Sequence, residues 1–258
     1  MRTKSTQQNR HNQRTSRQTQ LNGLGNIHQR NRTKQNAKRN TQKHCEKLWF
    51  TQFFERITQH LGHLLNILLV THNHNLIIDA VAGINAGGFE DPEGRGNGSI
   101  PNTMVVYEGK IYYDYKGVQD GFVGIDENHI LHVGKLTPKD VTERNIQYGV
   151  SFGPVLISNG EAATLTSGVN PRTAIGQRSD GAILMLVIDG RQVISLGATY
   201  QDLIDIFQEY GAVNACNLDG GSSSLMWYGG DYVNNCASVI GIRPVPTTFL
   251  VMKEGDAE

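Results

Sequence analysis

The chain has 258 residues, of which 38% are hydrophobic, and it carries 24 basic and 24 acidic side chains. This length and apolar content support a core in one large domain or two smaller ones. The longest apolar run, at 61–70, is far shorter than the roughly 20 residues that cross a bilayer, and no secretory signal is readable behind the basic N-terminus. The sequence therefore predicts no membrane-spanning helix.

The charges are segregated, although the formal net charge is zero. Residues 1–78 hold 13 of the 24 Lys and Arg but only 2 of the 24 Asp and Glu, and all nine tyrosines and all seven prolines follow residue 78. We therefore divide the chain into a basic, Gln- and Asn-rich arm over residues 1–78 and a domain over residues 79–258.

The arm is poor in hydrophobic residues up to about residue 47. It cannot repay the entropy lost on ordering, so we predict disorder there. Residues 48–70 have the apolar spacing of an amphipathic helix. A basic arm can contact nucleic acid or another anionic surface, but residues 1–47 lack aromatic side chains for stacking, so nucleic acid is not the favoured partner. The alternatives are a solvated tail, or a segment translated from a displaced reading frame in place of the domain's first strands.

Short β-rich runs separated by turn signals follow the arm. TMVVY–EG–KIYYD (103–114) predicts a hairpin, and so do GFVGI and HILHV on either side of DEN (126–128). AILMLVI–DG–RQVISL (182–196) predicts a third, because Asp189-Gly190 suits a type I′ turn.

One helix is expected over residues 199–210. Thr199 and Asp202 have the spacing of a capping box, one face is apolar, and Gly211 is a natural stop. AVNACNL (212–218) then resumes as a strand. These elements predict an α+β fold of antiparallel-rich mixed sheets packed with a few helices.

The cysteines give no metal or redox motif. Cys45, Cys216 and Cys236 form no CxxC pair. Cys216 and Cys236 are favoured as unpaired thiols over a disulfide.

Four glycine-rich polar stretches follow apolar runs, as loops at strand ends around a cleft do. They are GINAGGFED (83–91), FGPVLISNG (152–160), NPRTAIG (170–176) and NLDGGSSS (217–224).

The last stretch has the composition of an anion site. Gly220 and Gly221 let a ligand approach the main chain, and their N–H groups with the hydroxyls of 222–224 can form an anion-binding nest. Asp219 at the rim can act as base, nucleophile or metal ligand. The alternative is a tight turn in which Asp219 caps its own loop.

Arg172, between a proline and an apolar run, is the candidate guanidinium for a phosphate or carboxylate. Its alternative is a structural salt bridge. In the first stretch Asn85 supplies an amide, and Gly88 leaves space for a ligand because it has no side chain. Glu90 and Asp91 add carboxylates, and we interpret Asp91 as solvated.

Together these stretches resemble the phosphodiester glycosidase family, whose animal members remove N-acetylglucosamine from a sugar-1-phosphodiester. The resemblance covers about residues 80–252. It is carried, in order, by AGINAGGF, GNGSIPNTMV, FGPVLISNG, RTAIG, LVIDGRQ, NLDGGSSS and RPVPTTFLV.

The resemblance implies cleavage of a glycosidic bond beside a phosphodiester. It also implies an extracytoplasmic or cell-envelope setting, because bacterial members are often labelled exopolysaccharide proteins. The polar positions that match are Asn85, Arg172, Asp189, Asp219 and Ser222, with backbone from Gly220 and Gly221. Further substrate contacts are expected at Gly88, Gly153, Asn217 and Ser223.

The chemistry assigns roles to these residues. A phosphate leaving group needs charge stabilisation more than protonation, and Arg172 with the 220–222 N–H groups suits that need. Asp219 is the first choice as nucleophile or base, Asp189 the second and Glu90 the third. Asn85 would hold sugar hydroxyls. Because the candidate ligands are all oxygens, Ca²⁺ is the cation that could bridge them.

Two other functions fit the same residues. The domain can be a carbohydrate-binding or envelope-assembly module without catalysis, or a phosphodiesterase that cleaves P–O instead of C–O. The partner in each case is a sugar phosphate or glycopolymer.

Overall fold

The structure is a computed structural model that describes residues 65–69, 80–92, 98, 100–102, 104–113 and 121–252. All of them belong to one compact unit, Leu61–Glu258. Residues 1–64 lie outside the described part, so disorder in the arm stays a prediction.

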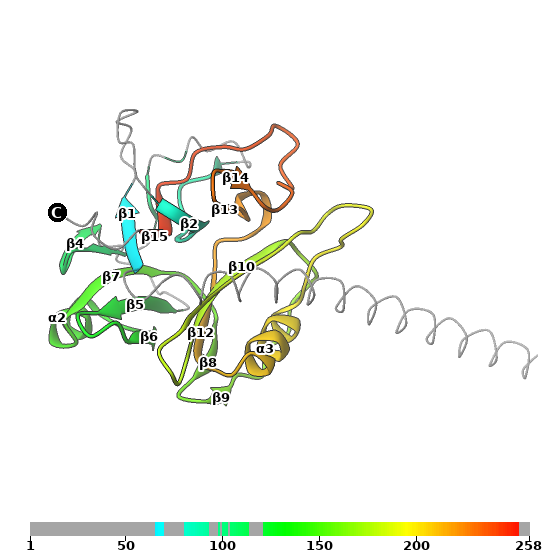
Figure 1. The fold of residues 1–258 in the computed structure, drawn as a ribbon. Coiled ribbons are helices and arrows are strands. Elements are labelled where there is room, and N and C mark those ends of the chain that lie inside the picture. The colour runs from blue at the N-terminus through cyan, green and yellow to red at the C-terminus, as the bar shows by residue number, and fades with distance from the viewer. Residues whose placement is uncertain are drawn as a thin grey trace, which may run out of the picture. The chain divides into compact units, whose positions relative to one another are not determined.

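Three five-stranded sheets form the unit (Figure 1). The first contains, in spatial order, β1 (Leu65–Leu69), β15 (Thr247–Met252), β2 (Ala80–Asn85), β13 (Met226–Tyr228) and β14 (Asp231–Tyr232). The second contains β11 (Ile183–Ile188), β10 (Arg172–Arg178), β12 (Ala212–Leu218), β8 (Val155–Ser158) and β9 (Glu161–Ala162). The third contains β4 (Lys110–Tyr113), β3 (Val105–Tyr107), β7 (Ile146–Ser151), β5 (Phe122–Asp126) and β6 (Leu131–Gly134).

Every strand pairing among the described residues is antiparallel. The helices in the described ranges are short: α2 (Pro138–Glu143), α3 (Tyr200–Glu209) and the 3₁₀ turn η2 (Gly221–Ser223). The predicted α+β class with antiparallel-rich sheets is confirmed.

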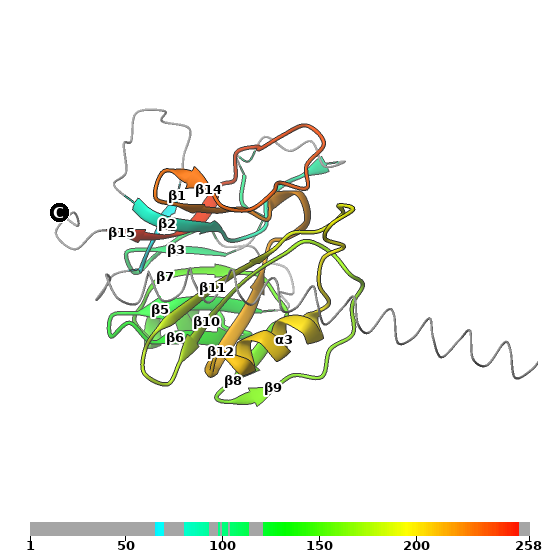
Figure 2. The same ribbon diagram turned by 45° about the vertical axis from the view of Figure 1, so that its right-hand side comes forward.

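Helix α3 lies along the second sheet, as Figure 2 shows. Its N-cap Thr199 and Asp202 form the predicted capping box, and Gly211 follows with φ of 75°. Phe207 packs on β10 where a Cβ at Gly176 would lie 2.8 Å from its ring, so the glycine permits close packing of helix on sheet. Strand β12 follows as predicted.

Two of the three predicted hairpins are present. Strands β3 and β4 pair around Glu108 and Gly109, which have φ of 49° and 71°, and β5 pairs with β6. Their core contains Met104, Val106, Phe122, Val141 and Ile146.

The third predicted hairpin is wrong. Strand β11 pairs with β10, and the turn lies between them at 179–182, where Arg178 N–H donates to the Ala182 carbonyl (2.9 Å). Asp189 and Gly190 instead begin a loop, because residues 191–196 close backbone hydrogen bonds among themselves, from the Arg191 N–H to Leu196 (3.3 Å) and from the Gln192 N–H to Ser195 (2.9 Å), and leave the outer edge of β11 unpaired among the described residues.

The helix predicted over 48–70 is wrong for its last turn. Residues Leu65–Leu69 form β1, which pairs with β15 from Leu65↔Val251 to Leu69↔Thr247. The rest of that prediction lies outside the described residues. In the part of the chain that the structure describes, no helix is long and apolar enough to cross a membrane.

Candidate functional site

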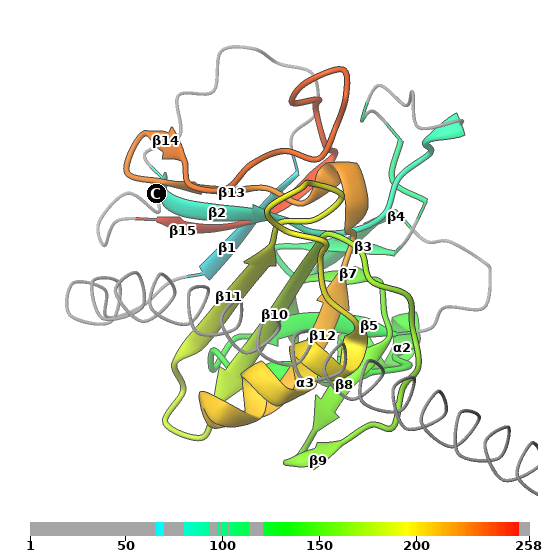
Figure 3. The ribbon, with the colours of Figure 1, turned by 90° about the vertical axis from the view of Figure 1, so that its right-hand side faces the viewer.

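The four glycine-rich stretches meet at the loop after β12. The Asp219 N–H donates to the Ala86 carbonyl (2.9 Å), Asn217 N–H to Pro154 (3.0 Å) and Gly221 N–H to Pro171 (3.0 Å). Segments far apart in sequence are thus fixed around residues 219–224, which we name the glycine–serine loop. Figure 3 shows this loop at the end of β12, in orange, next to β2.

Asn85 ties three segments together from the end of β2. It is 3% exposed. Its Nδ2 donates to the Asp219 carbonyl (2.6 Å), and its Oδ1 accepts from Thr173 Oγ1 (2.7 Å) and from the Leu225 N–H (3.1 Å). Three of the four hydrogen-bonding positions of the amide are therefore used inside the protein, where they hold the glycine–serine loop.

The two glycines serve backbone geometry. A Cβ at Gly220 would lie 2.9 Å from the Pro171 carbonyl oxygen, and Gly221 has φ of 61°, a region that side chains disfavour. The Gly220 N–H bonds the Asp219 carboxyl and the Gly221 N–H bonds Pro171. Two of the three predicted nest donors are thus used within the protein. The Ser222 N–H makes no such bond among the described residues.

Asp219 carries a perturbed carboxyl. Burial raises its pKa from 3.8 to about 6, and nearby Asp91 raises it as well, whereas bonds from Ser223 and Gly220 and the charge of Arg243 lower it. A carboxyl with this pKa changes charge near neutral pH, as a catalytic acid or base must. Perturbed groups of this kind mark candidate functional sites.

A guanidinium that the sequence analysis did not single out lies beside Asp219. Arg243 binds Asp91 bidentately, with Nη1–Oδ1 and Nη2–Oδ2 distances of 2.6 Å each, and its Nη2 lies 3.4 Å from Ser223 Oγ. The interpretation of Asp91 as a solvated acid is therefore wrong. Arg243 stands in RPVPTTFLV, so the resemblance contained the signal.

A second guanidinium reaches the same loop from the segment after β11. Arg191 has φ of 57° and donates to Asn170 Oδ1 (3.3 Å). Its Nη2 lies 3.4 Å from the position that a Cβ at Gly221 would take. The Arg191 guanidinium therefore lies at van der Waals distance from the Gly221 backbone.

Arg172, the predicted anion ligand, has its guanidinium bound elsewhere. Its Cα is close to Gly220 (3.8 Å from the Cβ position). Its Nε donates to the Ala198 carbonyl (3.1 Å), its Nη2 donates to Gly168 (2.9 Å), and the group stacks 4.2 Å from the centroid of the Tyr200 ring. In this arrangement it joins the segment before β10 to the segment before α3, and it forms no salt bridge with another described residue.

The other two predicted carboxylates differ in setting. Asp189 binds the segment after β14: it accepts from Asn234 Nδ2 (2.9 Å) and from the N–H of Asn235 (3.1 Å). Glu90 is exposed, and its N–H donates to the Ile100 carbonyl (2.9 Å). Asp189 therefore fixes the segment after β14. Glu90 lies on the surface and directly precedes Asp91 in the sequence.

The remaining predicted contacts lie close to the loop. The Asn217 Nδ2 donates to the Gly153 carbonyl (2.7 Å), and Asn217 Oδ1 is buried without a partner among the described residues. Ser223 is buried beside Arg243. Gly88 is packed against Asn102, whose Oδ1 would lie 2.8 Å from an added Cβ.

Oxygen ligands for a cation are present only in small number. The described residues contain no group of three or more His, Cys, Asp or Glu placed to hold a metal ion. Both oxygens of Asp91 accept from Arg243. Asp91 is therefore already paired with a guanidinium, and the possible Ca²⁺ stays a prediction.

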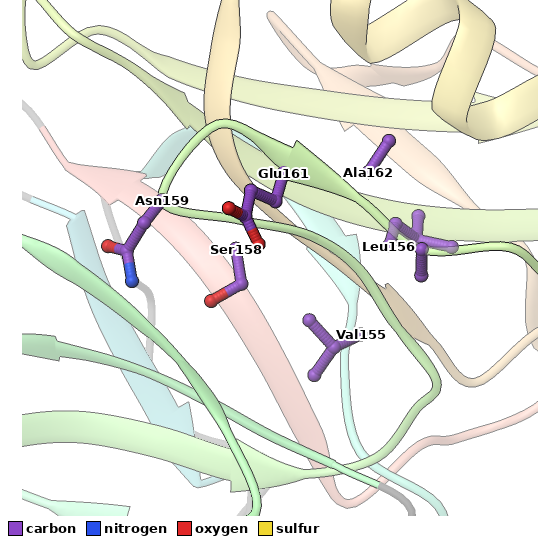
Figure 4. A pocket seen from close by; sticks show the side chains of 7 residues that line it. Val155, Leu156, Ser158, Asn159, Glu161 and Ala162 are labelled. Atoms are coloured by element: carbon purple, nitrogen blue, oxygen red, sulfur yellow. The ribbon is translucent and has the colours of Figure 1, made fainter.

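A cavity of about 440 Å³ lies along the β8–β9 hairpin (Figure 4). Its lining is Val155, Leu156, Ser158, Asn159, Glu161, Ala162 and Ala163. None of the predicted site residues lines it, and its one ionisable side chain is Glu161. We therefore base the site on the glycine–serine loop. Cys216 and Cys236 are unpaired, as favoured, and burial raises the pKa of Cys216 to about 12.

Comparisons with known proteins identify the family and the fold of this chain. The sequence model of the phosphodiester glycosidase family matches residues 79–252. A Bacillus subtilis (strain 168) protein described as SPbeta prophage-derived uncharacterized protein YomE is 30% identical over 196 residues, which are 69% of this chain and 29% of that protein. The chain thus spans under a third of that relative.

Two solved structures share the fold. One is the catalytic domain of zebrafish N-acetylglucosamine-1-phosphodiester alpha-N-acetylglucosaminidase, auto-inhibited by its pro-peptide, with a TM-score of 0.59 and 20% identity over 74% of this chain and 73% of that one. The other is a putative exported protein of Burkholderia pseudomallei, with a TM-score of 0.51 and 16% identity over 75% and 72%. The family match supports a hydrolase-type function, and the chain belongs to the phosphodiester glycosidase family.

Proposed function

We propose that this chain hydrolyses the glycosidic C1–O bond of a sugar-1-phosphodiester at the glycine–serine loop. The observation that carries the proposal is the Asp219 carboxyl, whose pKa is raised to about 6 beside Arg243 and Ser223. A carboxylate and a guanidinium at one loop are the two groups that this reaction requires.

The leaving group decides how the charges are used. When C1–O breaks, the electron pair stays on the phosphate oxygen, so negative charge grows there and little protonation is needed. Preorganised donors stabilise such charge in the transition state. Arg243 and Arg191 take this role in the proposal, because both guanidinium groups face residues 221–223.

Asp219 serves the attacking side. As a carboxylate it takes a proton from water whose oxygen bonds to C1, which yields the free sugar and a phosphate monoester. A carboxylate with a pKa near 6 is a better base than an ordinary one. Attack by Asp219 itself, followed by hydrolysis of the glycosyl ester, uses the same group and gives the same products.

Arg172 and Asn85 act indirectly. Arg172 joins the carbonyls of Gly168 and Ala198, and Asn85 holds the carbonyl of Asp219. We assign both as positioning residues, and Asp189 likewise, because it fixes the asparagines at 234 and 235.

Hydrolysis in ¹⁸O-labelled water tests the reaction. A panel of sugar-1-phosphodiesters, including N-acetylglucosamine, is incubated with the full chain, with Asp219→Asn and with the exposed control Asp231→Asn. We expect ¹⁸O on the sugar, loss of turnover in the first variant only, and equal rates with calcium or a chelator. Label on phosphate would make the protein a phosphodiesterase. Saturable binding without turnover would make it a binding module.

A further inference from the structure

Two loops beside the site end in exposed apolar side chains. Val193 and Val239 are fully exposed, and Ile194, Leu196 and Ile240 expose 79%, 68% and 67% of their surface. We name 191–196 and 236–243 the first and second apolar loops. Contiguous exposed apolar residues of this kind mark binding surfaces in soluble proteins.

Both tips are defined turns. In the first loop the Arg191 N–H donates to Leu196 (3.3 Å) and the Gln192 N–H to Ser195 (2.9 Å), which leaves Val193 and Ile194 at the tip. In the second, the Gly241 N–H donates to Ser238 (3.3 Å). The apolar residues are thus held outward by hydrogen-bonded backbone.

The two loops lie at the same end of the domain. Gln192 Nε2 donates to the Asn235 carbonyl (3.1 Å), and Asp189 Oδ2 accepts from Asn235 Nδ2 (3.2 Å). Figures 1 and 3 show the first loop in yellow and the second in orange to red, and in Figure 3 the first loop lies beyond the end of β11. We name the exposed apolar residues of the two loops the apolar rim.

The base of each loop carries an arginine that faces the glycine–serine loop. Arg191 begins the first and approaches Gly221, whereas Arg243 ends the second and reaches Ser223. Cys236 Sγ, at the start of the second loop, donates to the Ser222 carbonyl (3.6 Å). Cationic groups therefore lie at the base and apolar groups at the tips, next to the proposed phosphate position.

This order matches one ligand chemistry, an amphiphile whose anionic group joins an apolar chain. We propose that the substrate is a sugar-1-phosphate esterified to a lipid in a bilayer, and that the two loops enter the bilayer surface while the arginines hold the phosphate. The inference rests on the proposed function and adds the chemical class of the aglycone.

The test compares two substrates that share one sugar-1-phosphodiester. One has a methyl aglycone in solution and the other has a long alkyl chain in phosphatidylcholine vesicles. The variants are Val193→Asp/Ile194→Asp and Val239→Asp/Ile240→Asp. The control is Ile130→Asp, whose side chain is 49% exposed on the β5–β6 turn, away from the loops. All proteins are the full chain.

We expect each double variant to lose at least tenfold in kcat/KM on the lipid substrate and in flotation with the vesicles. Rates on the methyl substrate should stay within twofold, and Ile130→Asp should behave as the parent protein. Equal losses on both substrates, or no loss, would overturn the inference. So would a dimer that the double variants dissociate, because the rim would then be a contact between copies.

The same experiment distinguishes a failure of the lipid inference from a failure of the proposed function. If neither substrate is cleaved, the catalytic assignment fails, and flotation still decides whether the rim binds lipid. If only the methyl substrate is cleaved and the parent protein does not float, the catalytic assignment stands and the lipid inference fails.

Discussion

Asp219 is a costly residue for the fold, because its charged form is buried. Its pKa is raised from 3.8 to about 6 by burial. The folded state therefore holds the proton more tightly than the unfolded state. The stability that Asp219 contributes is fully present below about pH 4 and is lost as pH rises through about 6. At neutral pH the loss in the free energy of unfolding is about 3 kcal/mol.

The first prediction follows for Asp219→Asn. The neutral amide keeps an acceptor for Ser223 but removes the buried charge, so we expect the free energy of unfolding at pH 7 to rise by about 1–3 kcal/mol while turnover falls about a thousandfold or more. Urea unfolding with a parallel activity assay measures both. A variant that is both less stable and inactive would show that Asp219 is a structural group.

The pH dependence is the second prediction. If Asp219 acts as a carboxylate, kcat/KM should fall about tenfold per pH unit below its pKa of about 6 and level off above it. Initial rates between pH 4 and 8, with the fold checked by circular dichroism at each pH, test this. A rate that falls above pH 6 instead would make Asp219 the proton donor.

The third prediction separates two arginines. Arg243→Ala should lose about 10²–10³ in kcat/KM, and it should move the pH midpoint upward, because the charge of Arg243 lowers the pKa of Asp219. Arg172→Ala should lose about 1–3 kcal/mol of stability with its backbone bonds and leave the midpoint unchanged. Steady-state pH profiles of the folded proteins decide between them, with the exposed Arg144→Ala as control. A midpoint shift only in Arg172→Ala would reverse the two roles.

Among single residues, the sequence predicted the glycine–serine loop better than the arginines around it. The pattern of Asp219 before two glycines identified the loop because its cause is local backbone geometry. Arg243 could not be found in this way, since its partner Asp91 lies 152 residues away and only the folded sheet brings them together. Arg172 was predicted as an anion ligand because its residue type was visible, whereas the carbonyls that bind it were not.

Among the elements, local signals predicted what local bonds determine. The hairpin around Glu108-Gly109 and the capping box of α3 are present because their hydrogen bonds close within a few residues. The Asp189-Gly190 turn failed because residues 191–196 close backbone hydrogen bonds among themselves and do not pair with the outer edge of β11. Val193, Ile194 and Leu196 suggested a strand by propensity, but they are exposed in a loop.

The capping box gives the fourth prediction. Thr199 Oγ1 accepts from the Asp202 N–H (3.2 Å), and the Thr199 N–H donates to Asp202 Oδ2 (3.0 Å). Thr199→Ala should cost about 1 kcal/mol, which corresponds to about 2–4 °C in Tm for a domain of this size. Differential scanning calorimetry against the exposed loop variant Thr164→Ala measures it. Equal Tm values for the two variants would mean that packing alone holds the start of α3.

At the scale of the whole molecule, the family match and the folded unit begin at different residues. The match starts at residue 79, whereas the compact unit starts at Leu61 and contains β1. Strand β1 covers one edge of β15 along five residue pairs, and β2 covers the other. The composition of the sequence placed the boundary at residue 78 and missed β1. This strand is recognised only by its pairing with β15, which lies far later in the sequence.

The fifth prediction compares the fragments 61–258 and 79–258. The shorter fragment lacks β1, so β15 becomes an edge strand with unpaired backbone groups, which favours association with other chains. We expect 61–258 to keep the Tm and the turnover of the full chain, and 79–258 to melt at least about 5 °C lower and to aggregate on concentration. Calorimetry and light scattering measure these effects. If 79–258 instead melts with 61–258 and stays monomeric, β1 adds no stability, and the functional unit is the segment that matches the family.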